Sequence, residues 1–199
     1  RGGTLGDCDG AALASAFGYF NPAVSGGAWE SAKAKVSPRV AGKAHLACCA
    51  EHGRNKLSDI AGLAAFVAAA DAVNNAADPD GLTLYAAIKT EPLVSDIPGR
   101  AMQLVTVLRE FRGSAHLLAL RAMGIDSKTA HFVKRPNDVK MFGWTEADAP
   151  NIDDDLRARM VAAEELTDKL VAPAYGVLNA QERQDFLAGA QAIAAALAS

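Results

Sequence analysis

Two arginines and a histidine interrupt an otherwise apolar segment, LREFRGSAHLLAL. Arg109, Arg112 and His116 are spaced i, i+3 and i+7, so on an α-helix they lie along one strip, called here the charged strip. The strip adjoins the apolar face of the same helix, so we expect its three side chains to be mostly buried. On the same wheel Glu110 and Ser114 fall on the far side, where we expect them to be solvated.

Buried charges need partners, because an unpaired one costs several kcal/mol. In one interpretation of the charged strip, acids from neighbouring helices pair with the arginines, and the strip is purely structural. In the other, Arg109, Arg112 and His116 line a pocket, where the arginines hold an anionic or carbonyl-bearing ligand. His116 would then donate a hydrogen bond or carry a proton.

A short polar helix is predicted directly after the charged strip. The segment LRAMGIDSKTAHFVKR has the pattern of a helix, a glycine turn, a polar cap and a second helix. This pattern is typical of a DNA-binding helix-turn-helix, and an ordinary helical hairpin, which is commoner, shows it as well. In the DNA-binding alternative, the residues that would face phosphates or bases are Ser127, Lys128, Thr129, His131, Lys134 and Arg135.

The segment HLACCAEH places His45, Cys48, Cys49 and His52 on one helical face. These residue types bind metals, but structural zinc sites usually take ligands from two separate elements. We therefore favour core packing and predict no metal site. The sequence contains no glycine-rich phosphate loop and no GxSxG or HExxH motif, so we expect no cofactor.

The composition predicts an all-α fold that positions these residues in a multi-helix bundle. Hydrophobic residues make up 50% of the 199 residues but aromatic residues only 6%, and alanine, the best helix former, is abundant. We expect a helical half over residues 1–97 and a helix-turn-helix-like half over 98–199, together forming one compact unit. From caps, prolines and glycines, the main helices are expected at residues 39–51, 59–77, 98–123, 127–135, 153–171 and 180–199.

Charge is distributed unevenly along the chain. The net charge is −3, but residues 109–145 carry 7 basic and 3 acidic side chains, whereas residues 146–199 carry 4 and 10. An acidic chain is a poor general nucleic-acid binder, so we expect DNA binding to be weak and local. Three cysteines do not suggest a disulfide framework, and no apolar run approaches the roughly 20 residues that span a bilayer. We therefore expect a cytoplasmic protein that does not enter membranes.

The predicted helix over residues 153–171 has more apolar positions than one face of a small domain needs. For this reason we expect a homodimer that forms through this helix. The apolar positions recur at helical spacing and are Leu156, Met160, Ala163, Leu170 and Val171.

Four segments of the sequence, FGYFNPAVSGGAWESA, LREFRGSAHLLAL, MFGWTE and LTDKLVAPAYGVL, occur in this order along the chain. Together they resemble an actinobacterial family of helix-turn-helix proteins that includes SalK-like and EvbL-like members, whose biochemical role is unproven. Members usually have an Arg-Glu-His-Arg-Gly run followed by a second histidine; here Phe111 replaces the first histidine and His116 keeps the second.

The resemblance implies a C-terminal half built like a degenerate winged helix. Members usually begin with a further few dozen residues bearing a His and a Tyr-Phe motif, which we do not find here, so part of a pocket would be missing or supplied elsewhere. Many members also have a longer insert where this chain has HFVKRPNDVKMFGW, which leaves little wing for DNA.

We therefore predict a regulator-like protein that binds a small molecule through Arg109, Arg112 and His116, with weak DNA binding as an additional property. The alternative is an enzyme that acts on a small anionic or carbonyl-bearing metabolite, with His116 as acid or base.

Overall fold

A computed structural model describes residues 1–198 and confirms the all-α prediction, since these residues form helices and no strand. The winged part of the expectation is not confirmed, because residues 135–153 form turns, short 3₁₀ helices and irregular segments. The elements are η1 (Gly2–Leu5), α1 (Gly10–Phe17), α2 (Pro22–Lys33), α3 (Pro38–Leu57), α4 (Leu63–Ala76), α5 (Thr83–Lys89), α6 (Ile97–Ala122), α7 (Ser127–Lys134), η2 (Pro136–Asp138), η3 (Glu146–Asp148), α8 (Asp154–Tyr175) and α9 (Ala180–Ala198).

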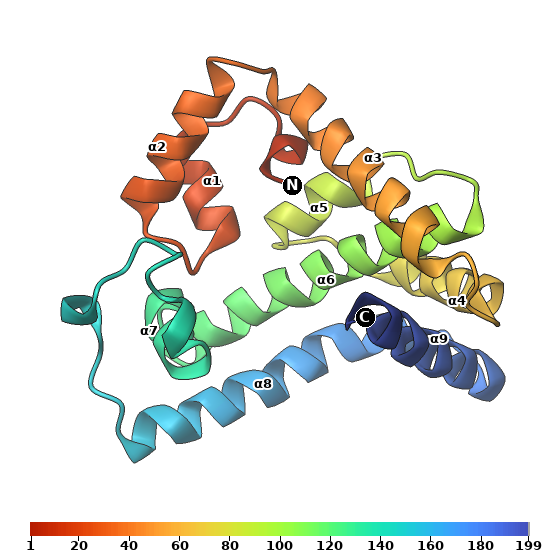
Figure 1. The fold of residues 1–199 in the computed structure, drawn as a ribbon. Coiled ribbons are helices and arrows are strands. Elements are labelled where there is room, and N and C mark those ends of the chain that lie inside the picture. Colours follow the sequence, from red (N-terminus) through yellow and green to blue (C-terminus); the bar gives the residue numbers. More distant parts are fainter. Residues whose placement is uncertain (199) are drawn as a thin grey trace.

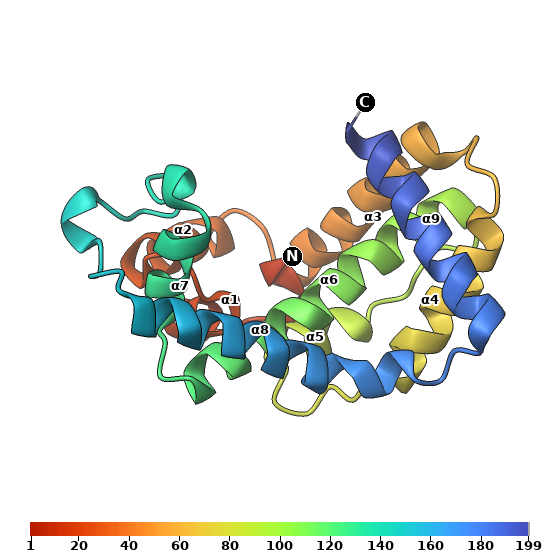
Figure 2. The same cartoon turned by 90° about the horizontal axis from the view of Figure 1, so that it is seen from below.

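Helix α6 is the axis of the molecule (Figure 1). Its 26 residues span about 39 Å and pack against α3, α4, α5 and α8. The side chain of Asp96 caps it by accepting a hydrogen bond from the Gly99 amide, and Gly124, at φ +67°, turns the chain after its end. Figure 2 shows α4 and α9 near one end of α6, and α1 and α7 near the other, with α8 running alongside.

The apolar residues form two clusters along α6. The larger cluster contains Phe66, Tyr85, Leu104 and Phe111 and gathers side chains from α3, α4, α5, α6, α8 and α9. It therefore contains residues from both sides of position 97, and the division of the chain there stays a prediction. The smaller cluster, which includes Leu120, packs the α6 end against α7 and α8.

Two helix ends differ from the predictions. Helix α3 was expected over residues 39–51 but continues to Leu57. Gly53 does not end it, since this glycine allows the α6 backbone to approach: a Cβ there would collide with the Pro98 carbonyl oxygen. Helix α8 was expected to end near Val171 but continues to Tyr175 through Pro173. Pro173 lacks a backbone N–H and so removes one hydrogen bond of the helix, and α8 ends within one turn after it.

Helix α8 buries most of its apolar positions within the chain. Leu156, Met160, Ala163 and Val171 are each at most 7% exposed, whereas Leu170 is 44% exposed. Val161 on the same helix is 60% exposed, and the homodimer stays a prediction.

Candidate functional site

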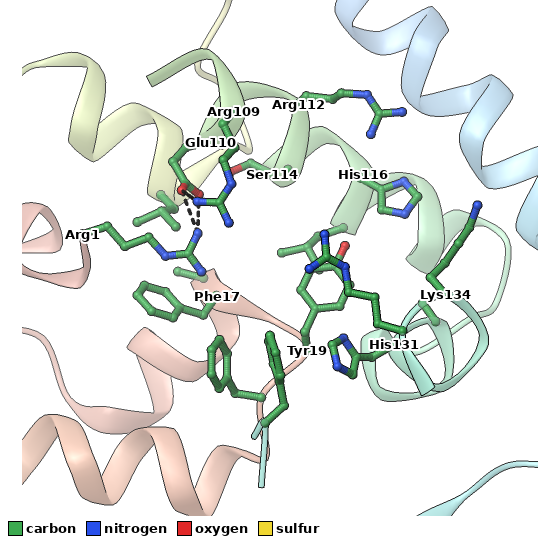
Figure 3. A pocket seen from close by; sticks show the side chains of 18 of the residues that line it. Arg1, Phe17, Tyr19, Arg109, Glu110, Arg112, Ser114, His116, His131 and Lys134 are labelled. Atoms are coloured by element: carbon green, nitrogen blue, oxygen red, sulfur yellow. Dashed lines mark hydrogen bonds and ion pairs between the residues drawn. The ribbon is translucent and has the colours of Figure 1, made fainter. Parts of the chain in front are cut away.

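A pocket of about 550 Å³ lies where α1, α6, α7 and α8 meet (Figure 3). Helix α6 contributes the charged strip, α7 contributes its last turn, and the segment after α1 contributes aromatic side chains. We call this cavity the charged pocket. Its charged lining residues are Arg1, Arg109, Arg112, Lys134, Arg135, Glu110 and Glu164, and its aromatic lining residues are Phe17, Tyr19, Phe20, Phe142, His116 and His131.

The expected burial of the two arginines in the charged strip is wrong. The side chains of Arg109 and Arg112 are 68% and 48% exposed, and His116 is half-buried. The charged strip faces the open pocket instead of the core, so water reaches the guanidinium groups. Conversely, Glu110 and Ser114 are buried, because other elements cover the far side of α6 as well.

Glu164 on α8 is the partner of Arg112. The Arg112 Nη2 atom lies 2.8 Å from Glu164 Oε2, and Lys134 Nζ from α7 lies 3.1 Å from Oε1 of the same carboxylate. Burial alone would raise the pKa of Glu164, but the bonds from Arg112 and Lys134 outweigh it and lower the pKa. Asp168 Oδ1 lies 3.6 Å from Arg112. A single ionised carboxylate thus holds cations from α6 and α7 in place.

Glu110 organises the opposite end of the charged pocket. Its side chain is 4% exposed and accepts two hydrogen bonds from Arg1 Nη1, at 2.7 and 2.8 Å. Arg109 Nη1 lies 3.1 Å from Oε1, and Figure 3 shows Arg1 and Arg109 converging on Glu110. Both ends of the pocket therefore place two cations on one carboxylate, which leaves an excess of positive charge.

The hydrogen bond of His116 to Thr167 identifies its tautomer. Thr167 Oγ1 donates a hydrogen bond to the Ala163 carbonyl at 2.7 Å, so it accepts one from the N–H group at His116 Nδ1, which lies 2.8 Å away. Burial lowers the pKa of His116, so the ring is neutral near pH 7. Nε2 of the neutral ring then carries a lone pair, which can accept a proton or a hydrogen bond from a group in the pocket.

His131 lines the charged pocket from α7 and is 4% exposed. Its Nε2 atom is buried and is the one buried side-chain nitrogen or oxygen in residues 1–198 that has no hydrogen-bond partner. Its ring packs against Phe142, with centroids 4.1 Å apart. Burial lowers the pKa of His131. Nearly all buried polar atoms in proteins are paired, so this unpaired nitrogen is an exception that needs an explanation.

Tyr19 is one of the aromatic lining residues of the charged pocket, and its backbone has a constrained conformation, with φ at +60°. Two contacts hold it: its amide donates to Ser127 Oγ at 2.9 Å, and its carbonyl accepts from Trp144 Nε1 at 2.6 Å. Burial raises the pKa of its hydroxyl to about 12, so Tyr19 stays a hydrogen-bond donor. Tyr19 is thereby attached to Ser127, the first residue of α7.

The residues predicted to face DNA are mostly engaged elsewhere. His131 is buried, which contradicts its predicted exposure, and the Ser127 hydroxyl is bonded to the Tyr19 amide. Lys134 and Arg135 line the charged pocket, and Lys128 Nζ lies 5.6 Å from the centroid of the Trp144 ring. Thr129 is half-buried, and its amide donates to Asp126, which caps α7.

The histidine and cysteine cluster on α3 does not pack in the core as expected. Cys48 and His52 are exposed, and His45 and Cys49 are half-buried, with 4.0 Å between His45 Nε2 and Cys49 Sγ. Core packing was thus wrong for Cys48 and His52. In the described residues 1–198, no three His, Cys, Asp or Glu side chains come together as a metal site.

Several residues of the site were not predicted from the sequence. Glu164, which lines the pocket, and Thr167, which is buried and bonded to His116, lie on α8. Their spacing of three residues places them on one face, but the sequence does not say that this face meets α6. Tyr19 carried a weak signal, since a glycine precedes it and aromatic residues flank it. A distant contact between two helices cannot be deduced from the periodicity of either.

Comparison with known proteins identifies a family. A profile described as a helix-turn-helix family matches residues 1–199, which confirms the family at this level. No curated protein and no solved structure matches the chain. The finer resemblance to SalK-like and EvbL-like members stays a prediction.

Proposed function

The chain belongs to this helix-turn-helix family, and we propose that it is a regulator-like protein whose charged pocket binds a small anionic molecule. The observation that carries the proposal is the excess of positive charge: the lining has five cationic side chains and two carboxylates. Asp138 and Asp168 lie just outside the lining, 3.8 Å from Arg135 and 3.6 Å from Arg112, and leave the surroundings positive. An anion would complete this charge balance.

The uncharged lining supports a ligand that is more than a bare anion. Tyr19 offers a hydroxyl donor, and His131 offers a buried nitrogen without a partner. Phe20 and Phe142 stack with centroids 4.2 Å apart and would cover an apolar body. We therefore expect an acid with an apolar portion, such as a carboxylate or a phosphate ester. Its anionic group would contact Arg112 and Lys134.

Ligand binding ranks ahead of DNA binding in this proposal. The second helix of the helix-turn-helix segment directs His131, Lys134 and Arg135 to the pocket, which leaves few side chains for bases. DNA binding remains part of the proposed function, in the weak and salt-sensitive form that the charge distribution predicts.

The experiment replaces Arg112 and measures binding and stability side by side. Isothermal titration with benzoate and with inorganic phosphate should detect binding to the wild type, and Arg112→Ala should weaken it by about 1.5 to 3 kcal/mol. The melting temperature should change little, because a half-exposed ion pair contributes only about 0.2 to 1 kcal/mol. Arg121→Ala is the matched control, since Arg121 is exposed on the same helix and outside the pocket. A variant that melts far lower yet binds normally would show that the charged strip is structural.

One observation favours the enzyme alternative as a second candidate. The bond to Thr167 leaves His116 Nε2 as an unprotonated acceptor, which is the state a general base needs. Arg109 and Arg112 would then hold the anionic group of a metabolite while His116 removes a proton. One measurement separates a binding protein from an enzyme, namely the exchange of substrate protons with solvent. In an enzyme this exchange would depend on His116, and in a binding protein it would not.

A further inference from the structure

A second cavity, of about 390 Å³, adjoins the charged pocket. We call it the apolar groove. It lies between α1 and α2 and shares Arg1, Phe17 and Phe20 with the charged pocket, so the two cavities meet at the phenylalanine rings. Its other side chains are largely apolar, and the main ones are Leu13, Val24, Ala28, Trp29 and Met141.

Two polar side chains that line the groove, Trp29 and Ser25, already have hydrogen-bond partners within the protein. Trp29 Nε1 donates to the Cys8 carbonyl at 2.8 Å, and Ser25 Oγ donates to the Asn21 carbonyl at 3.2 Å. Arg1 directs its guanidinium toward Glu110 and covers the Phe17 ring at 4.4 Å (Figure 3). An occupant of the groove would therefore meet mainly hydrocarbon and aromatic surface.

The groove also exposes apolar surface that an occupant would cover. Met141 and Val24 are 72% and 51% exposed, and Phe17 and Phe20 are half-buried. Covering such surface is favourable by about 25 cal/mol for each Å² removed from water. His131, whose buried Nε2 has no hydrogen-bond partner, lines the charged pocket beside it. The pair of cavities thus offers a polar end and an apolar end to a single molecule.

We infer that the ligand is an amphiphilic acid: its anionic group occupies the charged pocket, and an unbranched hydrocarbon chain crosses Phe17 and Phe20 into the apolar groove. This inference rests on the proposed function, and it adds the class of the ligand. A compact aromatic acid would fill the charged pocket alone. An alkyl chain bonded to the acid is the occupant that uses both cavities, because they meet at shared side chains.

The test is a series of alkanoates of increasing length. Butanoate, octanoate and dodecanoate are titrated below their micelle concentrations into the wild type. Affinity should rise with length, by up to about fourfold for each methylene that is fully buried. Ala28→Phe places a ring in the groove at an exposed position of α2 and should remove the rise, so that dodecanoate binds no better than butanoate. Ala23→Phe is the matched control, because Ala23 is an exposed alanine of α2 outside the groove, and it should keep the rise.

Tryptophan fluorescence gives a second readout. Trp29 lines the groove, so a brominated dodecanoate should quench part of the tryptophan fluorescence of the wild type. In Ala28→Phe, the same degree of quenching should require an at least tenfold higher concentration of the brominated dodecanoate.

The outcomes separate the inference from the proposed function. If butanoate binds and Arg112→Ala weakens it, but the length series is flat or Ala28→Phe leaves the rise intact, the hydrocarbon chain is not in the groove and the inference is overturned. If no alkanoate, benzoate or phosphate binds at all, the proposed function fails, and the inference fails with it. If Ala28→Phe instead converts a dimer to a monomer in sedimentation, a second copy of the chain covers the groove, and the inference is again overturned.

Discussion

His116 and His131 reach the charged pocket from different helices, and burial lowers the pKa of both. Glu164 opposes this effect at His116, where Arg112 and Lys134 reinforce it; at His131, Arg135 reinforces it and Asp138 opposes it. The balance leaves both rings neutral near pH 7. Each histidine is therefore harder to protonate in the folded protein than in the unfolded chain.

This difference predicts a loss of stability on acidification. Below about pH 6.5 the unfolded chain takes up protons that the folded protein does not. The free energy of unfolding therefore decreases as the pH is lowered, until the pH is below the folded pKa values. Melting curves between about pH 8 and about pH 5 measure the fall. His116→Asn, which keeps a donor near Nδ1, should reduce the slope, whereas His52→Gln, at an exposed position, should leave it unchanged. A bound anion favours the charged rings and should reduce the loss. Equal slopes in all three proteins would contradict the prediction.

At the level of single residues, the sequence predicted position better than environment. The spacing of Arg109, Arg112 and His116 correctly placed them on one side of α6. Their exposure was mispredicted, because periodicity predicts one buried face, whereas α6 is covered on several sides and is open where it lines the pocket. Glu110 shows the same error in reverse: it is buried, and Arg1, which is 109 positions away, neutralises it. No local pattern reports a partner at that distance.

Helices α4 and α9 pack closely, and a glycine makes this possible. A Cβ at Gly189 of α9 would overlap the Phe66 Cβ atom of α4, whereas a Cβ at Gly27 of α2 would meet nothing within 4 Å. Both residues lie inside helices. The same substitution should therefore have opposite effects at the two positions.

We expect Gly189→Ala to destabilise the protein by about 1 to 3 kcal/mol, because overpacking exceeds the gain in helix propensity. Gly27→Ala should stabilise it by about 0.5 to 1 kcal/mol through propensity alone. Urea unfolding of the two variants and the wild type measures both changes. If Gly189→Ala were as stable as Gly27→Ala, α4 and α9 would not be packed as described.

Helix positions were predictable wherever caps were explicit. Asp96, Asp126 and Asp153 each accept an amide hydrogen bond at the start of α6, α7 and α8, as their residue types suggest. Asn179 and Glu182 form the expected reciprocal cap of α9. The helix ends were less predictable, because a glycine inside a helix resembles a stop signal until its packing partner is known.

Across the whole molecule, charge limits what the helix-turn-helix segment can bind. Residues 109–145 carry a net charge of +4 and residues 146–199 a net charge of −6, and salt bridges from Glu164 and Asp168 neutralise part of the basic region. Among the helices of residues 1–198, none is both long and apolar enough to span a bilayer.

We therefore expect binding to random duplex DNA to be weak and steeply dependent on salt, with dissociation constants of about 10⁻⁴ to 10⁻⁶ M. Fluorescence anisotropy at several salt concentrations measures it. Lys128→Ala should lower the salt slope by about one, and Lys169→Ala, on acidic α8, should not. Tight binding that ignores salt would contradict the prediction.

Lys134 and Arg135 lie at the end of α7, where they line the charged pocket, and they are also candidates for contact with phosphates. One cation cannot serve both partners at full strength. Thermodynamic reciprocity then fixes the relation between them: if the small acid lowers the affinity for DNA tenfold, DNA lowers the affinity for the acid by the same factor. The acid and DNA would therefore compete for the protein, and the cellular concentration of the acid would set how much of the protein is available to DNA.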